Sequence, residues 1–130
     1  MQNEMIILTK AYGLIGWLLP KTEKFPRHYR SSVTQRMIDA ALRYVEQLYQ
    51  AQAFHGRLRR QALTEADAVL NQLRFYLRLA LDWQWLSLGQ YEHVSRLVEE
   101  NGRLLGGWLK APDPDEAGGE GERRRRRSEG

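Results

Sequence analysis

The stretch "LRFYLRLA", residues 73–80, decides the fold because it carries apolar side chains on two sides of a helix. On a helical wheel with about 100° per residue, the segment around it gathers one group of apolar side chains on a single arc. That arc holds Leu70, Leu73, Leu77, Ala80 and Leu81. The roughly opposite arc holds Phe75, Tyr76, Leu79, Trp83 and Leu86. A helix on the surface of a single bundle needs one apolar stripe, so the second arc requires a further packing partner.

A polar strip separates the two apolar arcs. It contains Asn71, Arg74, Arg78 and Asp82. Arg74 and Arg78 are four residues apart and therefore lie on one face of the helix. Two interpretations are open: the pair binds an anionic partner, or each arginine buries its stem and keeps its charged end in water.

Three other segments also show helical periodicity. The first, about residues 2–19, repeats apolar residues at spacings of four, three and four, and Pro20 is expected to end it. The second is expected over about residues 32–54 and the fourth over about residues 88–110. No segment alternates apolar and polar residues over a useful length, so no strand is predicted.

The third helix, which contains the opening stretch, is expected to begin at Thr64 as its N-cap and to run to about Trp85. Gly56 is expected to stop the second helix, and "RLRRQA", residues 57–62, reads as a basic connector. Four amphipathic helices joined by short loops predict an all-α fold, an up-down-up-down four-helix bundle.

The second apolar arc predicts a homo-oligomer, because large exposed apolar patches usually mark interfaces. Gly102, Gly106 and Gly107 fall inside the fourth helix, where each costs about 1 kcal/mol relative to alanine, and close approach of another helix would compensate. The predicted interface residues are Phe75, Leu79, Trp83, Gly102, Gly106 and Trp108. Two alternatives are open: the first helix covers the arc within one chain, and Gly106–Gly107 simply ends or bends the fourth helix.

Charge divides the chain into two regions. Residues 1–110 carry 15 Lys and Arg against 10 Asp and Glu, a net charge of +5, and are expected to form the bundle. Residues 111–130 carry five Arg and six acids, and their Pro, Gly and charge content predicts a disordered tail. The excess positive charge therefore belongs to the expected bundle, where it favours a polyanionic partner such as nucleic acid or an acidic protein.

Catalytic patterns are missing from the sequence. The chain has no cysteine, its three histidines are scattered, and its glycines fit neither a phosphate loop nor a dinucleotide motif. We therefore expect no enzymatic activity, no cofactor and no metal site. No uninterrupted apolar run is long enough to span a membrane and no signal peptide is legible, so a cytoplasmic protein is expected.

Basic residues remain as the candidate binding surface, for nucleic acid or for a protein partner. The candidates are Lys21, Lys24, Arg27, Arg30, Arg57, Arg59, Arg60, Arg74 and Arg78. Phe25, His28 and Tyr29 are interleaved with the first four, a pattern that suits phosphate contact combined with base stacking. The alternative for each loop cluster is ordinary solvated charge.

Three motifs in order resemble a known family. "FPRHYR" before the second helix, "LRFYLRLALD" in the third and "GRLLGGWLK" closing the fourth are similar to accessory variability determinant proteins of diversity-generating retroelements. The similarity runs over about residues 5–110 and excludes the tail. The positions in matching motifs are Pro26, Arg27, Arg74, Arg78, Gly102, Gly106 and Trp108.

The resemblance implies a homopentameric barrel of bundles that binds the reverse transcriptase of the same element and its template-repeat RNA or an RNA/DNA hybrid. Such a protein would support mutagenic reverse transcription and retrohoming without being the polymerase. A second hypothesis is a structural oligomer of the ribosomal RNA intervening-sequence type, which shares the four-helix bundle but lacks a reverse-transcriptase partner.

Overall fold

The structure, a computed structural model, describes residues 2–113, and these form helices without any strand. The four α-helices are α1 (Gln2–Thr22), α2 (Gln35–Ala53), α3 (Gly56–Asp82) and α4 (Leu88–Lys110). A 3-10 turn (Arg27–Tyr29) and a π turn (Arg30–Thr34) lead from α1 into α2. The predicted all-α four-helix fold is confirmed.

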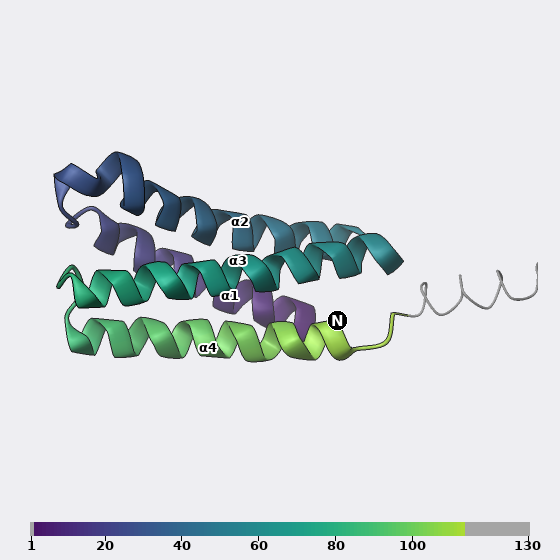
Figure 1. Cartoon of the computed structure of the whole chain (residues 1–130). Helices are drawn as coiled ribbons and strands as arrows, with labels where there is room; N and C mark the ends of the chain where they lie inside the picture. The colour runs from purple at the N-terminus through teal and green to yellow at the C-terminus, as the bar shows by residue number, and fades with distance from the viewer. Residues whose placement is uncertain (1, 114–130) are drawn as a thin grey trace, which may run out of the picture.

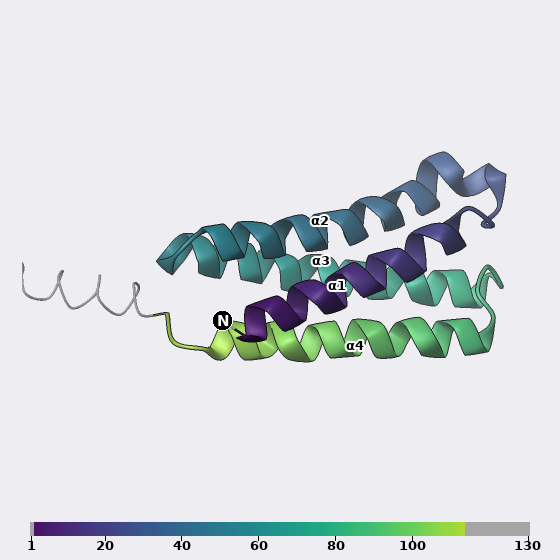
Figure 2. The same ribbon diagram turned by 180° about the vertical axis from the view of Figure 1, so that it is seen from behind.

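The helices run alternately up and down and close into a bundle (Figure 1). Each helix packs on its neighbours in sequence, and α1 also packs on α4. The α1–α2 and α3–α4 connections lie at one end, which we call the loop end and define as residues 23–34 and 83–87. The α2–α3 turn and the last turn of α4 lie at the opposite, terminal end. Seen from behind, α1 crosses obliquely from α4 at the terminal end toward α2 at the loop end (Figure 2).

The predicted apolar stripes form the core. On α3, the arc predicted to face the core is buried except for the partly buried Leu81. The other helices contribute buried stripes with helical spacing: Ile7, Ala11, Leu14 and Leu18 from α1; Met37, Ala41, Tyr44 and Leu48 from α2; Val94, Val98, Leu105 and Trp108 from α4. Burial of these side chains is the main force that holds the four helices together.

One buried polar pair crosses this core. The Tyr44 hydroxyl on α2 donates to Oδ1 of Asn101 on α4 at 3.0 Å. The Asn101 amide nitrogen donates in turn to the carbonyls of Lys10 and Leu97. Burial raises the pKa of the Tyr44 phenol, because an ionised phenolate would lose its hydration there. The pair therefore links three helices through polar groups that are satisfied inside the bundle.

The expected end of the first helix was wrong. Pro20 lies inside α1, which continues to Thr22. Proline lacks an N–H and leaves the carbonyl of the residue four positions earlier without its helical partner. That residue is Gly16, which is exposed, so water can replace the missing donor. The helix therefore tolerates proline in its last turns.

The expected start of the third helix was also wrong. Helix α3 begins at Gly56, so the basic segment read as a connector forms its first turns. The Thr64 hydroxyl donates to the Arg60 carbonyl at 2.8 Å, one turn back, and does not cap the helix. Gly56 has a positive φ of 60°, which allows a sharp reversal from α2 into α3. Ala62 and Leu63 are buried, so packing against α2 favours helix in this basic segment.

The end of α3 also differs from the expectation, because the helix stops at Asp82 and not near Trp85. Gln84 then adopts a positive φ of 63°, which reverses the chain toward α4. Ser87 caps α4 through a capping box with Gln90. Leu86, expected on the outer arc of the third helix, lies beyond the helix end and is buried in the core.

Candidate nucleic-acid interface

The polar strip of α3 is open to solvent. Arg74 and Arg78 are both exposed, one turn apart on the same helix. The Arg78 Nε donates to Asp82 Oδ1 at 3.0 Å, and this hydrogen bond raises the pKa of the Arg78 guanidinium. The two side chains of this pair are 66% and 53% exposed, so the strip presents a hydrated ion pair and not a buried one.

Arg74 is held across the groove between α3 and α4. Its Nη1 donates to Asn71 Oδ1 at 2.7 Å, and its Nη2 lies 2.7 Å from the position that a Cβ on Gly102 would occupy. No real Cβ contact is that short, so glycine at this position leaves room for the guanidinium. Gly102 thus admits a close neighbour, as expected, but that neighbour is a side chain of the same chain and not another helix backbone.

A hollow of about 140 Å³ lies beside Arg74 between the two helices. Its lining residues are Arg74, Leu77, Tyr91, Ser95, Val98 and Glu99. The guanidinium and the two hydroxyl groups can donate hydrogen bonds to an anionic or carbonyl oxygen, whereas the Glu99 carboxylate would repel a fully charged group placed beside it. The hollow therefore suits contact with one edge of a larger polar molecule.

The loop end carries cations without carboxylate partners. Lys24, Arg27 and Arg30 are exposed, and none of them forms an ion pair within residues 2–113. Lys21 is partly buried, with its Nζ 5.4 Å from the centroid of the Trp17 ring, a cation–π distance. Three positive charges at this end are therefore left to interact with a partner from outside the described chain.

Two tryptophans of the α3–α4 connection join the loop end, and the sequence analysis did not group them with the basic residues. The Tyr29 ring lies 5.3 Å from the Trp83 ring and 5.2 Å from the Trp85 ring, centroid to centroid. Trp85 also contacts Phe25 at 5.3 Å. The sequence pattern that could have indicated this aromatic cluster is "DWQWL", residues 82–86, in which two tryptophans flank a polar residue just after a helix.

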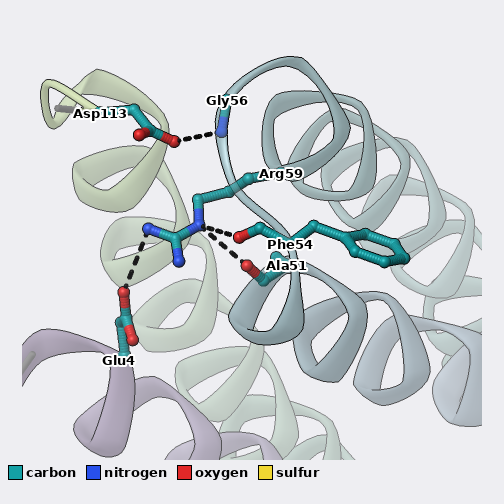
Figure 3. A network of polar contacts seen from close by, with 6 residues as sticks. All are labelled: Glu4, Ala51, Phe54, Gly56, Arg59 and Asp113. Atoms are coloured by element: carbon teal, nitrogen blue, oxygen red, sulfur yellow. Dashed lines mark hydrogen bonds and ion pairs between the residues drawn. The ribbon is translucent and has the colours of Figure 1, made fainter. Parts of the chain in front are cut away.

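Arg59 serves the fold of the chain itself at the terminal end (Figure 3). Its Nε donates to the carbonyls of Ala51 and Phe54, both at 2.9 Å, and its Nη1 lies 3.5 Å from Glu4. The guanidinium also lies 5.9 Å from the centroid of the Trp108 ring. Arg59, one of the nine predicted binding cations, thus uses its charge to join α1, α2 and α4 to α3.

The residues that follow α4 stay at the terminal end of the bundle and contact the start of α3. Asp113 accepts a hydrogen bond from the Gly56 backbone N–H through Oδ2 at 2.7 Å (Figure 3). A carboxylate at the first N–H of a helix is favoured by the helix dipole. Arg57 and Arg60 lie in the same turns of α3 and are exposed.

The structure does not gather all the predicted cations into one patch. Arg57 and Arg78 are 21 residues apart on one helix, which corresponds to about 32 Å along the axis. The strip of Arg74 and Arg78 lies in the last third of α3, the part that ends at the loop end, and Lys24, Arg27 and Arg30 belong to the loop end itself. Two basic regions result, and the one near the loop end is the richer in unpaired charge and aromatic rings.

The outer apolar arc of α3 remains partly uncovered. Phe75 is 62% exposed and Trp83 is 45% exposed, while Leu79 is partly buried. Helix α1 packs on α2 and α4, so the alternative in which α1 covers this arc is wrong for Phe75. Trp108, in contrast, is 8% exposed and contributes most of its surface to the core of its own chain.

The remaining glycines of α4 have open space around them. Apart from the adjacent residues and the backbone of α4 itself, no atom of the described chain lies within 4 Å of the position of a Cβ on Gly106 or Gly107. The helix continues through both to Lys110, so the interpretation that they end it is wrong. Nothing within the described chain therefore requires glycine at either position.

Residues 2–113 show neither a cluster of metal-binding side chains nor a membrane-spanning helix. Among the described residues, no three His, Cys, Asp or Glu side chains are placed to share a metal ion. None of the helices within residues 2–113 combines the length and apolar content that crossing a membrane requires.

The chain is similar to a protein family and to a solved structure. Residues 5–112 match the bAvd-like family. A solved structure from Bacteroides thetaiotaomicron, a protein of unknown function from the S23 ribosomal protein family, superposes with a TM-score of 0.77 at 14% sequence identity. That similarity covers 84% of this chain and 99% of the other, and at this identity it shows the shared fold alone. No curated protein matches the sequence.

Proposed function

Because this chain belongs to the bAvd-like family, we propose that it is a non-enzymatic accessory protein of a diversity-generating retroelement. In this role it binds the reverse transcriptase of the element together with template RNA or the RNA/cDNA hybrid, and supports mutagenic reverse transcription and retrohoming. The observation that carries the proposal is the family match, which spans nearly all of the four helices.

The charge distribution supports a nucleoprotein role. The net charge of +5 lies on residues 1–110, and the loop end contributes the exposed cations Lys24, Arg27 and Arg30. Arg74 and Arg78 add a pair that is exposed on one helix face beside a polar hollow. Neutralising phosphates with such residues releases counterions, so binding to RNA should weaken steeply as salt increases.

Oligomerisation is part of the proposal. Phe75 exposes most of its ring to water, and Gly106 and Gly107 leave an open surface on α4. A second copy of the chain packed against these positions would bury the ring and make use of the small residues. A closed pentameric barrel would repeat Arg74 and Arg78 in every subunit and so concentrate positive charge.

The competing hypothesis is an oligomer of the intervening-sequence type without a polymerase partner. The S23-family structure shares the fold, and its function is unknown, so it favours neither activity. The two hypotheses differ in one respect that an experiment can measure, namely whether this protein forms a complex with a reverse transcriptase.

A reconstitution tests the proposed function. The reverse transcriptase of the proposed element is purified with its template-repeat RNA, and complementary DNA synthesis is measured with and without this protein. We expect a three-component complex and cDNA that depends on the protein. A chain ending at Asp113, which keeps the Gly56 contact, should act like the full chain. A polymerase that neither binds this protein nor changes its output would contradict the proposal.

A further inference from the structure

We propose that the exposed ring of Trp83, supported by Tyr29 and lying at the same end of the bundle as the cations Lys24, Arg27 and Arg30, is a stacking site for an unpaired base of single-stranded RNA. The site combines a flat aromatic surface with positive charge that follows the sugar–phosphate backbone. That its ligand is RNA rests on the proposed function; the site itself is derived from the packing of two connections that are distant in sequence.

The aromatic rings hold one another in place. Trp83 contacts Tyr29 at 5.3 Å and Trp85 at 5.3 Å, the second contact being edge-to-face. Trp85 is anchored in turn by Phe25, which is buried. A ring fixed on two sides loses little conformational freedom when a base stacks on it, so the site is preorganised.

One ring of this cluster remains available for a ligand. Trp83 is 45% exposed although it contacts two other rings, whereas Phe25 is 4% exposed. Trp83 directly follows the end of α3, one turn beyond the exposed Arg78. A base stacked on Trp83 would therefore lie at the end of the helix that carries Arg78 and beside the α1–α2 connection that carries Tyr29.

The cations are placed to hold the phosphates next to such a base. Arg30 directly follows Tyr29 in sequence, and Arg27 precedes it by two residues in the same 3-10 turn. Consecutive Cα atoms are about 3.8 Å apart, so both guanidinium groups can reach a phosphate within one or two nucleotides of the stacked base. Lys24 is adjacent to Phe25 and extends the same region. None of the three is neutralised by a carboxylate within residues 2–113.

The arrangement favours single-stranded over double-stranded RNA. In a duplex each base is already stacked on its neighbours and paired, so its face is unavailable to a protein side chain. An exposed aromatic ring surrounded by cations recognises instead an unstacked base, with little dependence on its identity. The expected ligand is thus an unpaired loop or end of an RNA.

The first experiment requires no variant. The full-length protein is titrated with a uridine RNA of about 12 nucleotides and with an abasic chain that has the same length and phosphates. We expect the base-containing RNA to bind more tightly by about 5- to 160-fold, the equivalent of the ~1–3 kcal/mol that stacking of one base contributes. Equal affinities would overturn the proposal, because binding would then be purely electrostatic.

The second experiment assigns the effect to Trp83. A single 2-aminopurine placed in the uridine RNA loses fluorescence when it stacks on an aromatic ring. Trp83→Ala should abolish the quenching and most of the preference for bases, Trp83→Phe should retain a large part of both, and the control Tyr12→Ala, which removes an aromatic ring that is 80% exposed on α1, should change neither. Quenching that survives in Trp83→Ala would overturn the proposal.

Oligomer mass, measured by light scattering for each variant, separates stacking from assembly. If Trp83→Ala disperses the oligomer, Trp83 is a subunit contact and the stacking proposal is wrong. No polymerase is present in these experiments. If the RNA does not stack on Trp83, the stacking site is wrong, but the proposed function is still tested separately by the reconstitution. Conversely, stacking that persists while the polymerase fails to bind would contradict the proposed function and leave the RNA site intact.

Discussion

The guanidinium of Arg74 on α3 lies against the backbone of Gly102 on α4, with its Nη2 2.7 Å from the position of a Cβ on that glycine. The contact couples a residue of the predicted binding strip to a glycine that the sequence alone suggested for helix packing. It also orients Arg74 toward the hollow that the two helices share. The position of the Arg74 guanidinium on the surface therefore depends on the absence of a side chain at Gly102.

Gly102→Ala tests this coupling. The new methyl group displaces the Arg74 guanidinium, which is the flexible end of an exposed side chain and can move. Alanine also removes the helix penalty of glycine, about 1 kcal/mol. We expect the free energy of unfolding, measured in urea, to rise by up to about 1 kcal/mol while RNA affinity falls. Gly89→Ala, where a Cβ meets no atom within 4 Å, should leave RNA affinity unchanged. A destabilised Gly102→Ala protein would show that Arg74 cannot move.

Arg59 and Arg57 provide a comparison of two nearby arginines on α3. Arg59→Ala removes the donor to the Ala51 and Phe54 carbonyls and the contact with Trp108. We expect it to lower the free energy of unfolding by about 1–3 kcal/mol, since the partly buried carbonyl of Ala51 loses its partner. Arg57→Ala, at an exposed position, should change stability by less than about 0.5 kcal/mol. Equal unfolding midpoints for the two variants would contradict the structural role of Arg59.

The buried phenol of Tyr44 predicts a dependence of stability on pH. Burial raises its pKa in the folded protein above the ordinary value of 10.0, so the folded state retains the proton more strongly than the unfolded state does. The stability that this group contributes is complete below about pH 10 and is lost as the pH rises further. Tyr44→Phe should cost about 1–3 kcal/mol at neutral pH, because Asn101 Oδ1 loses its donor.

The difference between wild type and Tyr44→Phe isolates this group from the lysines that also titrate at high pH. Chemical unfolding measured from pH 7 to pH 11 should show the wild-type advantage shrinking above about pH 10. An advantage that stays constant across the range would mean that the phenol ionises equally easily in both states.

The periodic features of the fold were predictable because they are local. The stripe of Ile7, Ala11, Leu14 and Leu18 and the inner arc of α3 follow from the 3.6-residue repeat, and both are buried as expected except for the partly buried Leu81. The predicted bounds of the fourth helix, about residues 88–110, agree with the observed Leu88–Lys110, and in the structure Ser87 and Gln90 form the capping box at its start. Spacing and caps can be read from a few neighbouring residues without knowledge of the rest of the chain.

Features that depend on contacts distant in sequence were not predictable in the same way. Residues 57–62 look like a connector because of their charge, yet the burial of Ala62 and Leu63 against α2 makes them helical. The contact between Tyr29 and Trp83 joins residues 54 positions apart, and no periodicity encodes it. In the sequence nothing distinguishes Arg59 from the other basic residues. Its partners come from other helices, which lie beside α3 only in the folded bundle.

Gly106→Ala tests whether α4 contacts a second subunit. Within one chain a Cβ at this position has open space, so alanine should favour the helix by about 1 kcal/mol. If Gly106 lies at a subunit interface, the methyl group instead weakens assembly. We expect light scattering to show a smaller mass at low protein concentration, with the helical content of the chain retained. An unchanged oligomer with a higher unfolding midpoint would place Gly106 on a free surface.

The central claim is that the exposed strip of α3 binds the polymerase–RNA partner, and the double charge reversal Arg74→Glu with Arg78→Glu tests it. Both positions are exposed, so the change should create neither a cavity nor a buried unpaired charge. The new glutamate at position 78 faces Asp82 one turn away, which costs only about 0.2–0.5 kcal/mol. Arg36→Glu with Arg96→Glu, at exposed positions outside the predicted binding residues, gives the same change in net charge and serves as the control.

The decisive measurement is capture of the reverse transcriptase and its template RNA by each protein, made beside melting temperature and oligomer mass. We expect the Arg74/Arg78 variant to melt within about 5 °C of wild type, to keep its oligomer mass and to lose the complex, while the control retains it. Capture of the polymerase and RNA at wild-type levels by the Arg74/Arg78 variant would contradict the account.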